Sequence, residues 1–283
     1  DPIKKRHDSV EELLKNKKVR KDLTENLNEI GDLERLISRI CTSRATPREV
    51  VAVKSSLKKI PATKELLDQL KVSTLKNISE QLNPLENIVE KISTAIIDSP
   101  PAAVNEGGII RNGFSPELDE LRDISLHGKE WIATLQQTER ERTGIPSLKV
   151  NFNNVFGYYI DISHTHKNKI PDNYIRKQTL VNSERYITPE LKEYEDKILN
   201  AQEKINELES QLFNEIRAIV ANEAEIIQKN ARLIAMLDCL NSFAQCAEEY
   251  NYVKPNVDES NKINIVQGRH PVVERMVGCP HLF

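Results

Sequence analysis

The chain has 283 residues, of which 39% are hydrophobic, 29% are charged and only 5% are aromatic. This composition disfavours a large round core, and the few glycines and prolines leave long uninterrupted segments that are typical of extended helices. Because the formal net charge is -3, the sequence excludes a protein that coats nucleic acid through bulk positive charge, so any nucleic-acid site must be local.

The four cysteines have neither the CxxC spacing nor the neighbouring histidines of a tetrahedral metal site; they are Cys41, Cys239, Cys246 and Cys279. We expect reduced thiols, with Cys239 and Cys246 buried on one face of a helix. The sequence contains neither an apolar run of about 18 residues nor a signal peptide. A soluble, cytoplasmic protein without membrane contact is therefore expected.

Four helix starts follow one chemical pattern. A hydroxyl side chain can accept a hydrogen bond from a free backbone N–H, and an acidic residue follows at the positive end of the helix dipole. In three of the four, proline occupies the first helical position, where its missing N–H costs no bond. The starts are Ser9 with Glu12, Thr46 with Pro47 and Glu49, Ser115 with Pro116, and Thr188 with Pro189.

Two long helices are expected to flank residues 145–187. The first spans 116–144 and follows a loop over 99–113 that is punctuated by proline and glycine. The second begins after Thr188, and its apolar residues alternate steps of three and four, which is the spacing of a coiled-coil seam. The stripe continues to about Tyr250 after a one-residue slip, which predicts a single helix roughly 90 Å long. Residues 145–187 would then lie at the tip of an antiparallel helical arm.

The residues at this tip have the chemistry of β-strands. Apolar and polar residues alternate from Leu148 to Phe152 and again over 158–162, and Asn153-Asn154 between them favours a tight turn. Two further extended segments, YIRKQTLVN and SERYI, complete a small sheet of about four strands. Gly157 is expected at a bulge or at a close approach to the backbone. The predicted fold is mainly α, an elongated arm of long helices with a small four-stranded β insertion at its tip.

Positive charge is concentrated in this insertion. Residues 147–187 contain six Lys or Arg against three Asp or Glu, which gives 6 − 3 = +3, whereas the rest of the chain carries −3 − 3 = −6. Cations interleaved with amide and hydroxyl side chains are the groups that hold phosphate oxygens without reading bases. The alternative from charge alone is a solvated face, which is the commoner role of exposed charges.

Four other side chains have structural interpretations that outweigh functional ones. Trp131 and Tyr194 lie on the two long helices, where packing within the arm is far commoner than base stacking. His164 and His166 could point the same way and hold a metal ion. No third ligand is evident, so no metal site is predicted.

Several long segments of the chain resemble the MutS family of bacterial mismatch-repair proteins. The tip resembles the family's clamp region through SLKVNFNNVFGYYIDIS and PDNYIRKQTLVNSERYITPELKEYEDKI. The flanking helices resemble its lever through DPIKKRHDSVEELL, IGDLERLISRICTSRATPREV, GGIIRNGFSPELDELR and ERTGIPSLKV. GRHPVVE is similar to the segment that opens the family's ATPase domain. The resemblance extends over nearly the whole chain.

The resemblance implies a lever over 1–146 and 188–257, a clamp over 147–187, and the start of an ATPase domain over 258–283. It implies DNA mismatch repair by a cytoplasmic, nucleoid-associated homodimer whose clamps close on duplex DNA, with ATP and Mg²⁺ bound by the full-length protein and a MutL-type repair partner. By resemblance, the candidate phosphate contacts are Lys149, Asn153, Lys167, Lys169, Arg176, Lys177, Gln178, Asn182 and Arg185.

The sequence contains no GxxxxGK[ST] loop, so this chain is not expected to hydrolyse ATP or to bind a cofactor by itself. The region that inserts an aromatic residue at a mismatch in the family would precede Asp1. We expect a segment of a longer protein that is a monomer or a weak dimer. Two alternatives stay open: a coiled-coil scaffold whose basic tip binds a protein partner, and a member of the same family devoted to recombination intermediates.

Overall fold

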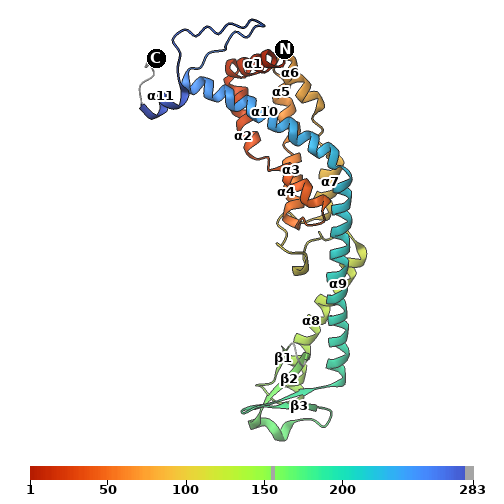
Figure 1. Ribbon diagram of the computed structural model, residues 1–283. Helices are drawn as coiled ribbons and strands as arrows, with labels where there is room; N and C mark the ends of the chain where they lie inside the picture. Colours follow the sequence, from red (N-terminus) through yellow and green to blue (C-terminus); the bar gives the residue numbers. More distant parts are fainter. Residues whose placement is uncertain (154–156, 278–283) are drawn as a thin grey trace.

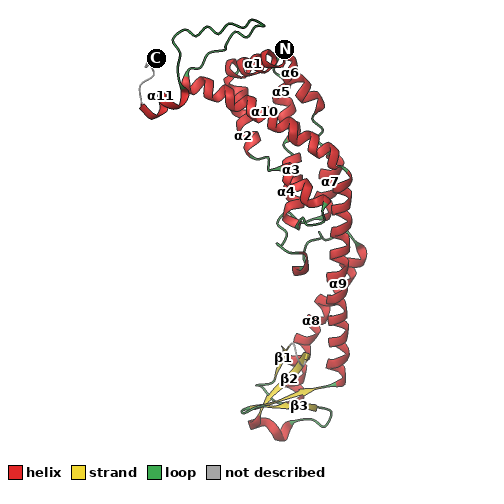
Figure 2. Ribbon diagram, in the orientation of Figure 1, coloured by secondary structure: helices red, strands yellow, loops and turns green. Residues whose placement is uncertain are grey.

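The computed structural model describes residues 1–153 and 157–277. The protein is elongated, with a helical body at one end and a small sheet at the other, joined by a narrow arm of two helices (Figure 1). Helices dominate, and the strands of the described residues lie at the tip of the arm (Figure 2). This is the mainly α architecture with a four-stranded insertion that the sequence predicts, so that prediction is confirmed.

The body consists of eight helices, which enclose the larger hydrophobic core together with the second half of α9 (Pro189–Asn222), the source of the buried Phe213, Ile216 and Val220. Seven of them come from the first third of the chain, and the eighth, α10, returns from the arm and packs on α1, α2, α3 and α6. The helices are α1 (Pro2–Lys15), α2 (Lys17–Asn28), α3 (Leu33–Cys41), α4 (Pro47–Leu57), α5 (Ile60–Asp68), α6 (Ser73–Gln81), α7 (Glu86–Ala95) and α10 (Ala224–Tyr250). Among the described residues, no helix is both long and apolar enough to cross a membrane.

Local chemistry at the helix starts is confirmed at three of the four predicted positions. Thr46 and Glu49 form a reciprocal capping box, and the hydroxyls of Ser115 and Thr188 accept the N–H three residues on. The prediction at Ser9 is wrong, because Asp1 caps α1 and Ser9 lies buried inside that helix. Its hydroxyl donates to the Lys5 carbonyl at 2.9 Å, a bond that a helix interior permits.

Thr46→Ala is expected to lower the free energy of unfolding by about 1 kcal/mol, because it removes the oxygen that accepts the Glu49 N–H at 3.3 Å. Urea denaturation followed by circular dichroism measures the change. The matched control is Thr94→Ala, at an exposed position inside α7, which should cost less than about 0.5 kcal/mol. Equal losses in the two variants would show that the capping box contributes nothing.

The arm is formed by α8 (Pro116–Thr143) and the first half of α9 (Pro189–Asn222), which lie side by side (Figure 1). A loop with the short 3₁₀ helix η1 (Val104–Glu106) leads into α8, which Gly144 ends in the left-handed conformation at φ 62°. Trp131 of α8 stacks on Tyr194 of α9 with ring centroids 3.5 Å apart. The predicted packing of these two rings within the arm is confirmed.

The prediction of one helix to Tyr250 is wrong, because the helix breaks at Glu223. There the backbone N–H donates to Val220 O, a bond of the i−3 type, and the next helix restarts with Ile227 N–H on Glu223 O. This break turns α10 across the body (Figure 1). At 1.5 Å per residue, the 34 residues of α9 span about 50 Å.

The predicted burial of two cysteines is also wrong. Cys239 and Cys246 are exposed, as is Cys41. The buried side of α10 is formed instead by Leu237, Leu240 and Ala244, which point toward the body from a different part of the helix circumference. Cys279 lies outside the described residues.

The tip sheet contains β1 (Lys149–Asn153), β2 (Gly157–Ser163), β3 (Ile175–Thr179) and β4 (Ser183–Ile187), in the order β1-β2-β4-β3. All neighbouring strands are antiparallel. The 3₁₀ helix η2 (His164–Lys169) follows β2. A second, smaller hydrophobic core fixes the sheet to the end of the arm. The predicted turn at Asn153-Asn154 extends beyond the described residues.

The chain after α10 forms a long loop and the short helix α11 (Pro271–Val277) (Figure 1). Arg269 holds the end of this loop to the end of α10, since its guanidinium donates to the carbonyls of Tyr250 and Asn251 at 2.9 and 3.0 Å. The origin of an ATPase domain in this segment stays a prediction.

Candidate nucleic-acid interface

The tip sheet has two chemically different faces. One packs on the arm through Ile160, Ile162 and Tyr186, which join Leu135 of α8 and Leu191 of α9 in the smaller core. Because side chains alternate along a strand, the residues between these apolar ones lie on the opposite side. We call that side the outer face.

A single row of side chains crosses the outer face on all four strands. The register pairs Lys149 with Asp161, Asp161 with Arg185, and Arg185 with Gln178. We call these four residues the outer row. Two cations flank one carboxylate in it, with an amide at the β3 edge. Asn153 is four residues beyond Lys149 on the same strand, so it lies on the same face.

Arg185 is held in place before any ligand binds. Its guanidinium lies over the ring of Tyr159, 4.3 Å from the centroid, and its Nη1 donates to Gln178 Oε1 at 2.8 Å. Tyr159 is only 7% exposed, although it belongs to the outer face. Stacking and a hydrogen bond leave a planar donor with little freedom, so binding an oxyanion would cost it less rotamer entropy than it costs a free lysine.

A β-bulge divides the cations of β3 between the two faces. Strict alternation would place Arg176 and Gln178 on one face, but the register shifts between them, so Arg176 pairs with Tyr186 and Gln178 with Arg185. Arg176 therefore lies on the side of the arm, and Gln178 joins the outer row. Lys177, at the bulge itself, is exposed.

Lys167 and Arg176 both face the buried carboxylate of Glu184. Lys167 Nζ lies 3.3 Å and Arg176 Nη1 3.8 Å from Glu184 Oε1, while His164 Nδ1 lies 4.0 Å away. The Tyr186 hydroxyl donates to the other oxygen. That hydrogen bond, aided by Lys167 and Arg176, holds the pKa of Glu184 below its ordinary value despite burial, so the group is a carboxylate at neutral pH.

The other candidates lie apart from the outer row. Lys169 Nζ donates to the Gly144 carbonyl at 3.1 Å, where a cation suits the C-terminal end of α8. Asn182 is exposed in the turn between β3 and β4. The structure thus brings together Lys149, Gln178 and Arg185, with Asn153 on the same face, and it places the others elsewhere. Contact of any of the nine with phosphate stays a prediction.

Two glutamates that the sequence analysis did not single out organise the tip. Besides Glu184, Glu195 of α9 is buried and accepts the Tyr158 N–H at 2.5 Å, with Lys192 as a second partner. Gly157, at φ 74°, lies so close that a Cβ there would overlap the Glu195 carboxylate. The predicted close approach at Gly157 is confirmed. The available signal was a glutamate within the apolar seam of α9.

The two histidines of the tip, His164 and His166, have no third ligand beside them among the described residues. His164 Nε2 lies 3.0 Å from the Leu180 carbonyl oxygen, while its other nitrogen faces Glu184. Across residues 1–153 and 157–277, no group of three or more His, Cys, Asp or Glu side chains could hold a metal ion.

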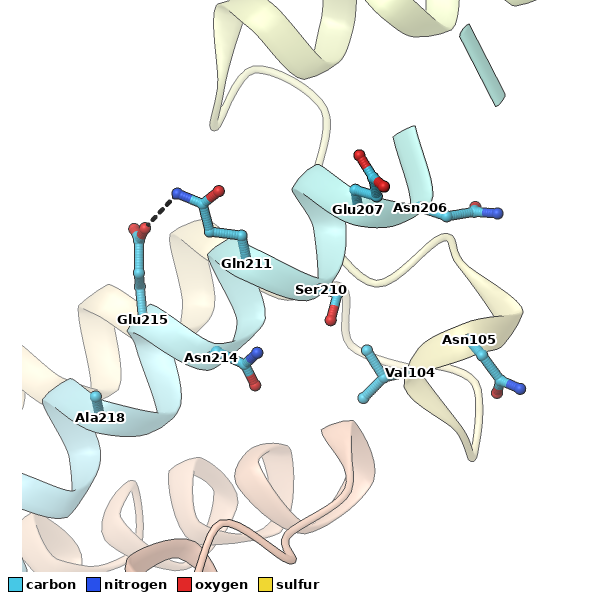
Figure 3. Close-up of a pocket in the computed structure, with 9 residues that line it drawn as sticks. All are labelled: Val104, Asn105, Asn206, Glu207, Ser210, Gln211, Asn214, Glu215 and Ala218. Atoms are coloured by element: carbon cyan, nitrogen blue, oxygen red, sulfur yellow. Dashed lines mark hydrogen bonds between the residues drawn. The ribbon is translucent and has the colours of Figure 1, made fainter. Parts of the chain in front are cut away.

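A groove at the base of the arm differs from the outer row in its chemistry. It lies between α9 and η1, has a volume of about 890 Å³, and is lined by Asn206, Gln211 and Glu215 among others (Figure 3). Gln211 donates to Glu215 at 3.0 Å. The lining contains two glutamates and no lysine or arginine, so the groove is a poor site for a polyanion.

Comparison with known proteins places the chain in a family. The family model described as MutS domain III matches residues 1–244. The DNA mismatch repair protein MutS of Salinibacter ruber is 50% identical over 96% of this chain, and that of Halothermothrix orenii is 49% identical over 97%. The MutS of Parabacteroides distasonis is 49% identical over 99%. The chain spans 30%, 31% and 32% of the length of these three relatives. Since the family model matches most residues of the chain, the chain belongs to the MutS family.

Proposed function

We propose that this chain acts in DNA mismatch repair as the part of a MutS protein that grips the backbone of duplex DNA and transmits movement along a lever. The observation that carries the proposal is the outer row, in which Lys149 and a preformed Arg185 flank Asp161, with the Gln178 amide at the edge, on the outer face of a sheet at the end of a long arm. The names of its relatives, which are DNA mismatch repair proteins, support the same process.

The outer row suits phosphates better than bases. Lys149 and Arg185 are two strands apart, which is about 10 Å at the usual strand spacing of about 4.8 Å. That distance exceeds the axial rise of about 3.4 Å between neighbouring phosphates of one DNA strand, so the two cations would reach different phosphates. A shallow sheet surface does not enter a groove as a helix or a protruding β-ribbon does. Binding is therefore expected to be independent of sequence and of mismatches.

The arm suits the transmission of movement. α9 continues without a break from the sheet to the body. Glu195 ties the sheet to α9, and the stacked Trp131 and Tyr194 tie α8 to α9. The second half of α9 is packed in the body through Phe213, Ile216 and Val220. A small rotation where α9 leaves the body, near Ile205, would be magnified along the first half of α9, over about 25 Å to the tip. We propose that this motion opens and closes the clamp.

The resemblance to the family implies that the full-length protein binds ATP and Mg²⁺, and two features bear on whether the residues of this chain could hold them. The sequence offers no phosphate-binding GxxxxGK[ST] loop, and the described residues contain no group of three or more His, Cys, Asp or Glu that could hold a metal ion. The proposed grip on DNA therefore involves neither ATP nor Mg²⁺. For the full-length protein we propose a nucleoid-associated homodimer with a MutL-type repair partner. The division into lever, clamp and the first residues of an ATPase domain is part of the same proposal.

The test is titration of this chain onto a labelled duplex, matched and mismatched, by fluorescence anisotropy at several salt concentrations. We expect weak binding that is equal on both duplexes, with a log-log salt slope of about −2 to −3 for two or three phosphates. Lys149→Ala with Arg185→Ala should abolish most of the slope. Lys197→Ala with Lys204→Ala removes the same charge from exposed positions on the arm and is the matched control.

Two results would contradict the proposal. One is the absence of binding at low salt, and the other is an equal loss in the tip variant and the arm control. Either would favour the alternative of a helical scaffold whose tip binds a protein partner.

A further inference from the structure

Glu184 is an unusual element of a surface that is proposed to hold DNA. It is 3% exposed and lies on β4 directly before Arg185, so the two side chains point to opposite faces of the sheet. Its Oε1 faces Lys167 from η2 and Arg176 from β3, both of which are 60% exposed. A buried carboxylate thus faces two of the six cations of the insertion.

These two cations differ from Arg185 in what a phosphate would have to displace. Arg185 is stacked on a neutral ring and bonded to a neutral amide. Its neighbour in the outer row is the carboxylate of Asp161, but among the described residues the two side chains form no ion pair. Lys167 and Arg176 already neutralise a carboxylate. Moving either cation to a phosphate would leave Glu184 with less compensation in a buried position, which is costly. Counterion release on DNA binding is correspondingly smaller for them.

Lys167 and Arg176 lie where Glu184 and DNA can compete for them. β3 is the edge strand of the sheet, and η2 covers the end of β2, so Arg176 and Lys167 lie at the margin of the tip. Their long side chains are exposed for more than half of their surface, which leaves them able to turn outward. His164 is the remaining basic group that faces the same carboxylate oxygen.

We propose that Glu184 limits the affinity of the tip for DNA by holding Lys167 and Arg176 in an internal ion-pair group, so that the outer row alone grips the backbone. The inference rests on the proposed function and adds a residue that tunes it. A grip of two or three phosphates remains weak and reversible, as a clamp that opens and closes requires. Removal of the Glu184 charge releases two further cations for phosphate.

The first test compares Glu184→Gln with the wild-type chain in the anisotropy titration. Glutamine keeps the size of the side chain and can still accept the Tyr186 hydroxyl. We expect affinity at low salt to rise by at least about threefold, and the salt slope to steepen by about 1 to 2 as one or two phosphates are added. Asp172→Asn is the matched control, because it removes one negative charge from an exposed position of the same insertion.

The second test removes the two cations in both backgrounds. In the wild-type chain, Lys167→Ala with Arg176→Ala should weaken binding less than Lys149→Ala with Arg185→Ala does. In the Glu184→Gln background the same pair should cost more, cancelling the gain, and the difference measures the coupling to Glu184. Circular dichroism shows whether Glu184→Gln folds. If it does not fold, the proposal is tested by comparing the Lys167/Arg176 variant with the Lys149/Arg185 variant in the wild-type background.

The outcomes separate the two proposals. If the wild-type chain does not bind duplex DNA, the proposed function fails and the role of Glu184 fails with it. If the chain binds through Lys149 and Arg185 but Glu184→Gln behaves as Asp172→Asn does, only the inference is overturned. A loss in the Lys167 and Arg176 variant as large as that of the outer-row variant would also overturn it.

Discussion

Replacing Arg122 by Ala is expected to lower the free energy of unfolding by about 3–5 kcal/mol, because it leaves Glu209 buried without its charged partner. The Glu209 side chain is 1% exposed, and the Arg122 guanidinium forms its ion pair at the base of the arm. Removal of one member of a buried pair is far costlier than the pair itself is stabilising, since the remaining charge has lost its water and gains nothing in return.

The same arginine also organises the loop that leads into the arm. Its guanidinium donates to the Ile110 carbonyl and to the Asn112 side chain, at 2.8 and 2.7 Å. Glu209 in turn accepts the Ile109 N–H at 3.2 Å. One ion pair thus joins α8, α9 and the loop between the body and the arm. The loss in Arg122→Ala should therefore include the order of this junction.

Urea denaturation, followed by circular dichroism and by the fluorescence of the single tryptophan, measures the effect. The matched control is Arg35→Ala, whose partner Asp32 is 3.8 Å away with both side chains exposed, and it should cost less than about 1 kcal/mol. Glu209→Gln added to Arg122→Ala should restore part of the loss, because it removes the unpaired charge. A loss no larger than the control, or no recovery in the double variant, would refute the explanation.

Features that depend on nearby residues were predictable from the sequence. The capping box at Thr46 and the ends of α8 follow from side chains within a few positions, and the structure has them as predicted. The four strands likewise follow from alternation and turn residues. The arm itself was predictable because two amphipathic helices that flank a strand-forming segment must lie side by side and in opposite directions.

Features that depend on where a helix meets the body were not predictable. The break at Glu223 is marked by no glycine or proline in the sequence, and the one-residue slip in the stripe before Ile216 lies within α9, which is continuous there. The exposure of Cys239 depends on which side of α10 the body helices cover. Such contacts are set by tertiary packing, and no local pattern encodes them.

The sequence predicted which residues make up the candidate site, but it did not predict which face of the sheet each of them occupies. All its cations belong to the insertion, as the charge count indicates, but a single bulge at Lys177 decides which face Arg176 and Gln178 occupy. Glu184 counted only as one negative charge in the sequence. Its burial, and the two cations that face it, are properties of the folded sheet alone.

The second large effect concerns the contact between the two helices of the arm. Gly128 lies inside α8 where no turn requires a glycine, and a Cβ at this position would overlap the side chain of Ile198 on α9. The glycine therefore permits the two helices to approach closely. Gly128→Val is expected to lower the free energy of unfolding by about 1–3 kcal/mol, because the added methyl groups force the helices apart.

A compensating variant distinguishes this contact from a general effect of valine in a helix. Ile198→Ala alone should cost about 2–5 kcal/mol by leaving a cavity, whereas Gly128→Val with Ile198→Ala should cost less than the sum by at least about 1 kcal/mol. Ala133→Val, at an exposed position of α8, is the control and should cost less than about 0.7 kcal/mol. Strict additivity would mean that Gly128 and Ile198 do not meet. Coupling would show that Gly128 and Ile198 set the separation of the two helices. Because the tip sheet packs on the ends of these helices, Gly128→Val should then also weaken DNA binding, although it alters no residue of the outer row.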